Sequence, residues 1–149
     1  MARSSASRPS RVRAAATPAS QLTGVAAVVA AQRLQQFRLH YDNDEKMLWA
    51  QFEYTGRPCF SPQVLNEAQQ VQRLVRDLSL AATGAGDEAP LRYLVLGSRV
   101  PGIWNLGGDL ELFANLIRRR DRGELTRYAH LCCEVGYINN SRDRAKLLD

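Results

Sequence analysis

An apolar run, a pair of glycines and an amphipathic run follow one another between residues 91 and 122. Leu91 to Gly97 is an apolar segment of strand length that predicts a buried strand, and residues 109–122 place apolar side chains at helical spacing. The intervening segment ends in Gly107-Gly108 and leads into Asp109, a residue type that suits a helix N-cap. The sequence therefore predicts a strand, a glycine corner and a helix, in that order.

Periodicity and capping signals predict the other elements. Two segments with polar and apolar alternation predict an antiparallel hairpin, and Ser61-Pro62 predicts a helix start because serine caps and proline fits the first helical position. The expected elements are strands at 36–41, 46–54 and 91–97 and helices at 62–80, 109–122 and 124–137, with a loop at 83–90 and Gly123 ending the second of these helices. The order ββαβαα predicts an α/β fold whose sheet expects further strands.

Positive charge is concentrated near the N-terminus. The formal net charge is +5, but residues 1–41 hold six Arg and no acid, whereas residues 42–149 hold 14 basic and 15 acidic residues, a net charge of −1. No nucleic-acid-binding surface is therefore expected on the globular part. Residues 1–34 are rich in Ser, Ala and Arg and are expected to form a largely disordered tail, with a short helix within 20–34. The longest apolar run, Val25 to Ala31, is too short to span a membrane.

The cysteines and histidines show no metal-binding pattern. Three cysteines, two of them adjacent at Cys132 and Cys133, argue against a disulfide framework, and no zinc-ligand spacing is present. No metal or cofactor is expected, and a reducing cytoplasm is the expected compartment. His40 and His130 lie far apart in the sequence with no nucleophile motif beside them, and Cys59 is expected to pack beneath its loop.

The acidic residues and the tryptophans discussed next are expected to have structural roles. Glu53 is expected to pair with a basic side chain on the surface, and Glu111 and Glu134 are expected on solvated helix faces. Trp49 is expected in the core, and Trp104 is expected to anchor its loop.

The glycine pair permits two interpretations from spacing alone. A tight loop between a strand and a helix needs glycine for steric reasons, and this is the simpler interpretation. The alternative is that bare backbone approaches a ligand at a helix start, where free N–H groups and the helix dipole favour negative charge. Such a corner is one way to build half of an oxyanion hole.

Two segments resemble the crotonase (enoyl-CoA hydratase/isomerase) superfamily, and within it the diffusible signal factor synthases. The first is Gly56-Arg57-Pro58-Cys59-Phe60, and the second runs from Leu94-Val95-Leu96-Gly97-Ser98 through Asn105-Leu106-Gly107-Gly108-Asp109-Leu110, continuing with Phe113, Leu116-Ile117-Arg118, Asp121-Arg122 and Tyr128-Ala129. The resemblance covers roughly residues 35–135. It implies the N-terminal half of a crotonase fold over residues 35–137, followed by a polar end at 138–149 that departs from the family.

The resemblance also implies a chemistry. Members of the superfamily bind an acyl thioester and stabilise its enolate with two backbone N–H groups, the first of which matches Gly108. Leu106, Gly107 and Trp104 are then expected to contact substrate. Signal factor synthases dehydrate a 3-hydroxyacyl chain on acyl carrier protein (ACP) and hydrolyse its thioester, with two glutamates for acid and base work. No cofactor and no membrane are implied, and the family assembles from trimers.

The family's second donor and its two glutamates match no residue of this sequence, so the resemblance leaves three hypotheses. The first is the N-terminal portion of a signal factor synthase-type enzyme, acting on an acyl-ACP thioester and contributing the first donor. The second is an inactive truncated fragment or an assembly partner of full-length subunits. The third is an enoyl-CoA hydratase or isomerase, which would take an acyl-CoA thioester.

Overall fold

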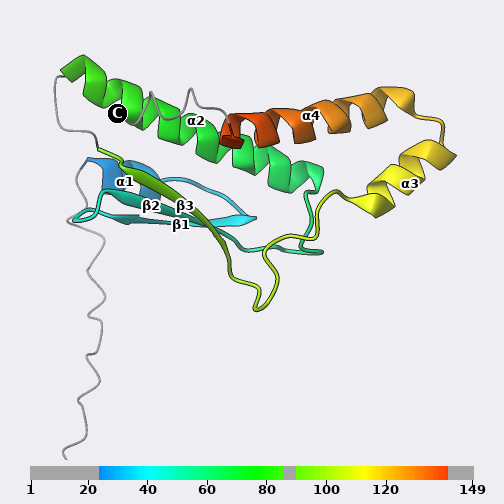
Figure 1. Ribbon diagram of the computed structural model, residues 1–149, viewed down its shortest axis with the longest axis horizontal. Helices are drawn as coiled ribbons and strands as arrows, with labels where there is room; N and C mark the ends of the chain where they lie inside the picture. The colour runs from blue at the N-terminus through cyan, green and yellow to red at the C-terminus, as the bar shows by residue number, and fades with distance from the viewer. Residues whose placement is uncertain (1–23, 86–89, 141–149) are drawn as a thin grey trace, which may run out of the picture.

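The computed structural model describes residues 24–85 and 90–140, a mixed α/β arrangement with a three-stranded sheet and four helices (Figure 1). Side chains are described except at 82–85 and 137–140. The elements in chain order are α1 (Val25–Ala30), β1 (Phe37–Asp42), β2 (Met47–Phe52), α2 (Pro62–Ala85), β3 (Tyr93–Ser98), α3 (Leu110–Arg118) and α4 (Arg122–Asn140).

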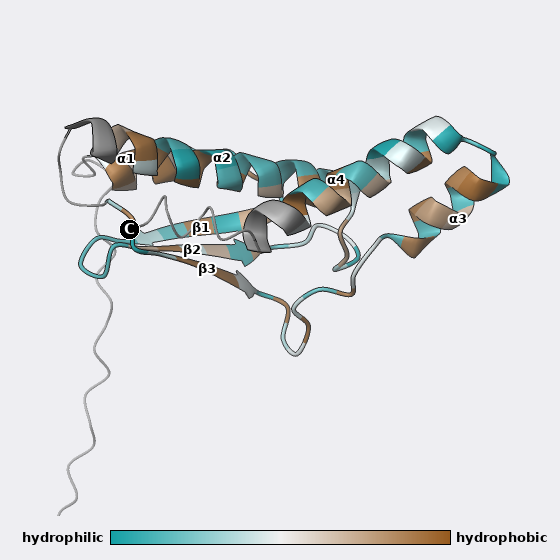
Figure 2. Ribbon diagram, turned by 45° about the horizontal axis from the view of Figure 1, so that its top comes forward, coloured by the Kyte–Doolittle hydropathy of each residue, from teal (hydrophilic) through white to brown (hydrophobic). Residues whose placement is uncertain are grey.

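The sheet has the order β1-β2-β3. β1 and β2 form an antiparallel hairpin, whereas β2 and β3 run parallel because α2 carries the chain back across the sheet. Helices α1, α2 and α4 lie on one side of the sheet, α3 extends beyond the end of the sheet next to α4, and the opposite face carries no element among the described residues (Figures 1 and 2). The sheet therefore has one face covered by helices and one open face.

The core lies between the covered face of the sheet and α2. Leu48, Ala50 and Phe52 alternate along β2 toward the helices and are almost completely buried. On α2, Val64 and Leu65 are each 1% exposed and pack in the same region. The apolar side chains that alternate along β2 and those at helical spacing on α2 therefore pack into one layer, as the sequence pattern predicts.

Helix α2 begins as predicted. The backbone N–H of Val64 donates to Ser61 Oγ at 3.3 Å, and Pro62 occupies the first helical position. The helix runs to Ala85, past the predicted end at residue 80, because alanines 81 and 82 favour the helix and no proline interrupts it.

Two predictions for the sheet are wrong. The third strand is Tyr93–Ser98 rather than 91–97, and none of its residues is buried, because β3 is an edge strand with β2 on one side only among the described residues. Trp49 does not lie in the core: it alternates with buried Leu48 and Ala50, faces the open side of the sheet and is 36% exposed.

The predicted helix 109–122 is shorter in the structure, where α3 covers Leu110–Arg118 and Arg122 already belongs to α4. α3 ends at Arg118, Arg120 adopts a left-handed conformation with φ 55°, and Asp121 Oδ1 accepts the Glu124 N–H at 3.1 Å to cap α4. Gly123 therefore lies in the first turn of α4 and does not end α3, contrary to prediction. A non-glycine residue at positive φ carries no clear sequence signal.

The ends of the chain are described in part. α1 confirms a short helix within 20–34, with Val29 buried. α4 continues to Asn140, beyond the predicted end at 137 and into the segment 138–149. The predictions for residues 1–23, 86–89 and 141–149 lie outside the described residues. None of the helices within 24–85 and 90–140 combines the length and apolar character needed to cross a bilayer.

Candidate functional site

The corner predicted from the glycine pair lies where the loop after β3 runs beside the loop after β2. Gly108 forms an isolated parallel bridge with Phe60. Phe60 N–H donates to the Gly107 carbonyl at 2.8 Å, and Leu106 N–H donates to the Pro58 carbonyl at 2.7 Å. The structure thus brings together the two segments, 56–60 and 105–110, that carry the family resemblance.

The peptide between Gly107 and Gly108 has a fixed orientation. It is trans, so its carbonyl and its N–H point in opposite directions. Because the Gly107 carbonyl faces Phe60, the Gly108 N–H faces away from Phe60. Gly108 is exposed, and its N–H has no hydrogen-bond partner among the described residues. The corner therefore presents one oriented, unsatisfied backbone donor.

Tyr128 on α4 fixes both sides of this corner. Its hydroxyl donates to the Phe60 carbonyl at 2.7 Å and accepts the Asp109 N–H at 2.7 Å. The ring is 4% exposed and packs edge-on against Phe113, with 5.2 Å between ring centroids. Burial raises the pKa of Tyr128 to about 12, so the hydroxyl keeps its proton at neutral pH and can donate.

A second set of contacts fixes the start of the corner. Asn105 Oδ1 accepts the Gly107 N–H at 2.6 Å, an Asx-type turn, and Asn105 Nδ2 donates to the Tyr54 hydroxyl at 2.8 Å. The Tyr54 hydroxyl donates to the Trp104 carbonyl at 2.9 Å. The Trp104 ring packs edge-on against Phe52, with 5.4 Å between centroids, which confirms its predicted role as a loop anchor.

The two glycines differ in what the backbone requires of them. Gly107 has φ +88°, a conformation that L-residues rarely adopt. Gly108 has no such φ, and a Cβ built on it would lie 3.6 Å from the Tyr128 hydroxyl and 3.9 Å from the Phe113 ring, ordinary contact distances. Only Gly107 needs glycine for its conformation.

The corner leads directly into the N-terminus of α3. Asp109 accepts the Leu112 N–H at 3.0 Å, which confirms it as the N-cap. Glu111 is exposed, as predicted, and forms a 3.2 Å ion pair with Arg57 of the facing loop. Both side chains are about two-thirds exposed, at 66% and 69%, so this pair contributes little stability. The helix dipole adds positive potential near the free Gly108 N–H.

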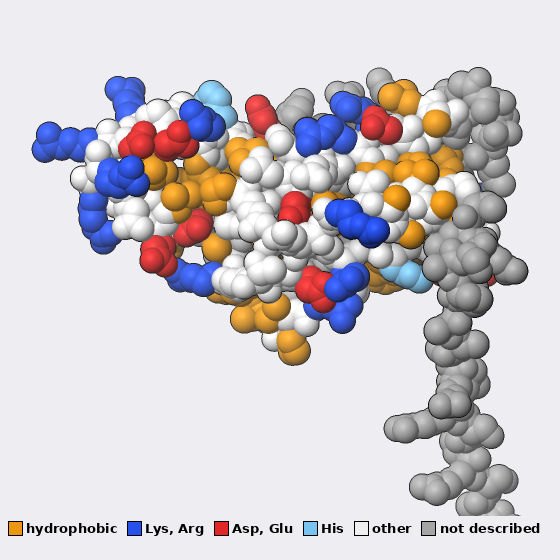
Figure 3. Space-filling model, turned by 180° about the vertical axis from the view of Figure 1, so that it is seen from behind, with side chains coloured by type: hydrophobic (Ala, Val, Ile, Leu, Met, Phe, Trp, Pro, Cys, Tyr) orange, Lys and Arg blue, Asp and Glu red, His pale blue; other side chains and the backbone are white. Residues whose placement is uncertain are grey.

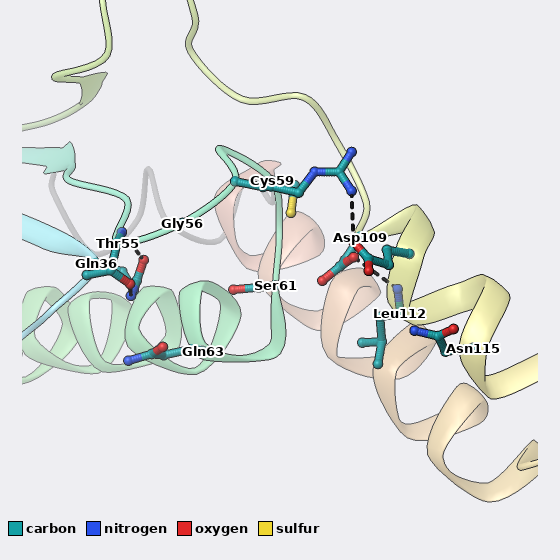
Figure 4. Close-up of a pocket in the computed structure, with 11 residues that line it drawn as sticks. Gln36, Thr55, Gly56, Cys59, Ser61, Gln63, Asp109, Leu112 and Asn115 are labelled. Atoms are coloured by element: carbon teal, nitrogen blue, oxygen red, sulfur yellow. Dashed lines mark hydrogen bonds and ion pairs between the residues drawn. The ribbon is translucent and has the colours of Figure 1, made fainter.

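Two hollows of different character meet beside the corner. A polar pocket of about 420 Å³ lies next to Asp109 and is lined by Gln36, Thr55, Ser61 and Gln63, among others (Figure 4). A second hollow of about 600 Å³ lies between α2, α3 and α4. Its apolar lining residues are Pro62, Leu112, Leu116, Tyr128 and Leu131, and the rest of its lining is polar or charged: Asn66, Gln69, Glu124, Arg127, His130 and Glu134. Leu112 lines both hollows, so they adjoin.

The remaining predicted contact residues surround the corner. The Trp104 and Leu106 side chains are 50% and 62% exposed. Hydrophobic side chains gather at the tip of the loop that follows β3, where they are open to solvent (Figure 3). The corner, its donor and these exposed side chains therefore form one accessible region.

Cys59 points from its loop into the polar pocket (Figure 4) but is 7% exposed, which confirms that it packs beneath the loop. Burial, and to a smaller degree the charge of Asp109, raises the pKa of its thiol. The thiol is therefore protonated at neutral pH and is a poor nucleophile.

Other polar residues have structural roles. Glu53 pairs with Arg38 at 2.6 Å and Arg99 at 3.4 Å, which confirms its predicted surface pairing. His40, His130 and Glu134 are exposed. Within the described ranges, no three His, Cys, Asp or Glu side chains come together in a way that could hold a metal ion.

The sequence analysis names Asn105 and Tyr128 only as part of the family resemblance and does not predict that they hold the corner in place. Asn105 before a glycine pair is a local turn signal that could have been used. Tyr128 has no such signal, because it reaches a residue 68 positions earlier in the chain. No protein-family profile and no curated protein sequence matches this chain.

Proposed function

We propose that the chain binds an acyl thioester and that the Gly108 N–H donates a hydrogen bond to the thioester carbonyl oxygen, as the first oxyanion donor of a crotonase-type enzyme does. The observation that supports this most is the orientation of the Gly107–Gly108 peptide. Its carbonyl is held by Phe60, and its N–H is exposed and without a partner among the described residues. A fixed donor stabilises developing negative charge without reorganising.

The rigidity of the corner supports the same proposal. Contacts from Tyr128, Asn105 and Phe60 hold the peptides on both sides of Gly108. The nearby N-terminus of α3 adds favourable potential for an oxyanion. In this proposal the polar pocket beside Asp109 takes the polar part of the thioester, and the adjoining hollow lined by Leu112 and Leu116 takes the acyl chain.

The proposed substrate class is a 3-hydroxyacyl thioester on ACP, as the resemblance to signal factor synthases implies. The chain would supply binding and one donor. The family's second donor and glutamates match no residue in this sequence, so we expect binding of the thioester without its consumption. Trimeric assembly, as in the family, is part of the proposal.

Nuclear magnetic resonance of the ¹⁵N-labelled chain tests the donor directly. A 3-hydroxyacyl pantetheine thioester should move the Gly108 amide proton downfield, because a hydrogen bond to the carbonyl deshields it. The matching thioether, in which CH₂ replaces the carbonyl, should not. The Gly102 amide, in the same loop, serves as the internal reference. Equal shifts with both compounds, or no shift with either, would refute the proposal.

Two substitutions test the same proposal by their effect on thioester binding. Gly108→Ala places a methyl group beside the donor where the fold has room for it, so thioester binding should weaken while the stability is kept. Gly123→Ala in α4 is the control and should leave binding unchanged. Comparing ACP and CoA thioesters of the same acid then separates the signal factor synthase hypothesis from the hydratase hypothesis.

A further inference from the structure

Exposed arginines gather at the turn between α3 and α4, at one end of the molecule (Figure 3). They are Arg118, Arg119, Arg120 and Arg122, and none of them forms an ion pair with another described residue. The two acids of the turn already have contacts there, since Asp121 caps α4 and Glu124 pairs with Arg127 at 2.7 Å. Residues 118–127 hold five Arg, one Asp and one Glu, so the turn has a net charge of +3 within a region, 42–149, whose net charge is −1.

The backbone of the turn holds these side chains in a fixed arrangement. Arg120 N–H donates to the Ile117 carbonyl at 3.0 Å and Asp121 N–H donates to the Leu116 carbonyl at 2.9 Å, the two bonds of a Schellman C-cap. Glycine is the usual residue at the left-handed position of this motif, but Arg120 occupies it with φ 55°. The fold therefore keeps a strained arginine in the turn, and its guanidinium has no hydrogen bond or ion pair among the described residues. Backbone strain of this kind is concentrated at functional surfaces.

Helix α3 also presents apolar side chains next to the arginines. The helix extends beyond the end of the sheet and packs chiefly against α4, so its outer side is uncovered within the described residues (Figures 1 and 2). Leu110 and Ile117, seven residues apart and so on one side of the helix, are 75% and 60% exposed. These two side chains and the four arginines define the α3 surface. Apolar area combined with arginine is typical of protein–protein interfaces.

The chemistry of the α3 surface favours an acidic protein over a nucleic acid. Guanidinium groups form paired hydrogen bonds with carboxylates and with phosphates, so the arginines alone fit both. A phosphate backbone, however, offers nothing to Leu110 and Ile117, and it would meet the exposed carboxylates of Glu111 and Glu124. A protein that carries carboxylates around apolar side chains matches both parts of the surface.

We propose that the α3 surface docks the carrier protein of an acyl-ACP thioester, with carboxylates of the carrier on the arginines and its apolar side chains on Leu110 and Ile117. The identity of this partner rests on the proposed function. Helix α3 connects the two places, because the Gly108 corner precedes its first residue and the arginines lie at its C-terminal end. Its 9 residues span about 14 Å, a distance that the extended prosthetic arm of a carrier protein can cross.

Binding of a carrier protein without an acyl chain tests the proposal, because docking by charge needs no thioester. Isothermal titration calorimetry of the full chain with holo acyl carrier protein should show an association that weakens by about tenfold from low to high salt. The double variant Arg119→Glu/Arg122→Glu should weaken it by at least about tenfold, since like charges then meet. Arg73→Glu, at an exposed arginine of α2, is the matched control and should bind like the wild type.

Arg120→Gly separates docking from folding. It removes one charge and also the strain of the left-handed position, so binding should weaken by about threefold while the urea midpoint rises. Four results would each overturn the proposal: a wild type that binds no carrier protein, arginine variants that bind it like the wild type, an equal loss in Arg73→Glu, or tighter binding of a single-stranded oligonucleotide than of the carrier.

The Gly108 amide distinguishes failure of docking from failure of the proposed function. A 3-hydroxyacyl pantetheine thioester has no protein part, so the double variant should show the same downfield shift of this amide as the wild type. A wild type that shows the shift but binds no carrier protein overturns the docking proposal alone. A wild type that binds the carrier through its arginines without the shift refutes the oxyanion donor and supports the docking surface.

Discussion

The Tyr128 hydroxyl is the contact whose removal most directly tests how the corner is held. In Tyr128→Phe the ring and its packing against Phe113 remain, but the Phe60 carbonyl and the Asp109 N–H each lose a 2.7 Å hydrogen bond inside the fold. Leaving buried polar groups unpaired costs about 1–3 kcal/mol. We therefore expect the free energy of unfolding to fall by about 2 kcal/mol at pH 7.

The raised pKa of Tyr128 predicts how the difference in unfolding free energy between the wild type and Tyr128→Phe changes with pH. The pKa of Tyr128 is raised by burial from 10.0 to about 12 in the folded state. An unfolded chain therefore loses the tyrosine proton first as the pH rises, so the stabilisation is complete below about pH 10 and is lost between about pH 10 and 12. At pH 11 the wild type should have lost about 1.4 kcal/mol of its advantage over Tyr128→Phe.

Urea denaturation followed by far-ultraviolet circular dichroism at pH 7 and pH 11 measures both effects. The comparison with Tyr128→Phe isolates Tyr128, because the raised pKa values of Tyr41 and Tyr54 are common to both proteins. Equal stability at pH 7, or a difference that is unchanged at pH 11, would show that the hydroxyl does not bridge the two segments.

Five further substitutions test the glycine pair, the α3 cap and the core by the same denaturation measurement. Gly107→Ala should cost about 1 kcal/mol because its φ is positive, whereas Gly108→Ala should stay within about 0.5 kcal/mol of the wild type, and equal effects would contradict the different roles of the two glycines. Asp109→Ala should cost about 1 kcal/mol through loss of the α3 cap, and Asp109→Asn should restore most of it, since either side chain can accept the Leu112 N–H. Leu65→Ala, at a position that is 1% exposed, should cost about 3 kcal/mol, and a cost below about 1 kcal/mol would show that α2 does not pack on the sheet.

The sequence predicts those elements whose signals are local. The start of α2 follows from Ser61-Pro62, and the cap of α3 from Asp109, because capping involves residues three positions apart. The hairpin strands follow from alternation within a few residues. For these elements the physical cause and the sequence signal lie in the same short segment.

The wrong predictions depend on information that is not local. Alternation shows that Trp49 and Ala50 face opposite sides of the sheet, but which side is covered depends on where the helices pack. The exposure of β3 likewise depends on its place at the sheet edge and not on its own apolar residues. The hydrogen bonds of Tyr128 join parts of the chain that come together only in the folded structure.

The glycine pair shows why spacing alone could not separate a steric loop from a ligand site. At Gly107 the steric interpretation is sufficient, because the left-handed backbone itself calls for glycine. At Gly108 it is not, because neither the backbone conformation nor the neighbouring atoms exclude a methyl group. Under the proposed function, glycine at 108 lets the thioester carbonyl approach the free N–H beside it. If the proposed function is right, the functional signal in this pair lies in Gly108, and the contacts of Gly107, Asn105 and Tyr128 hold its donor in place.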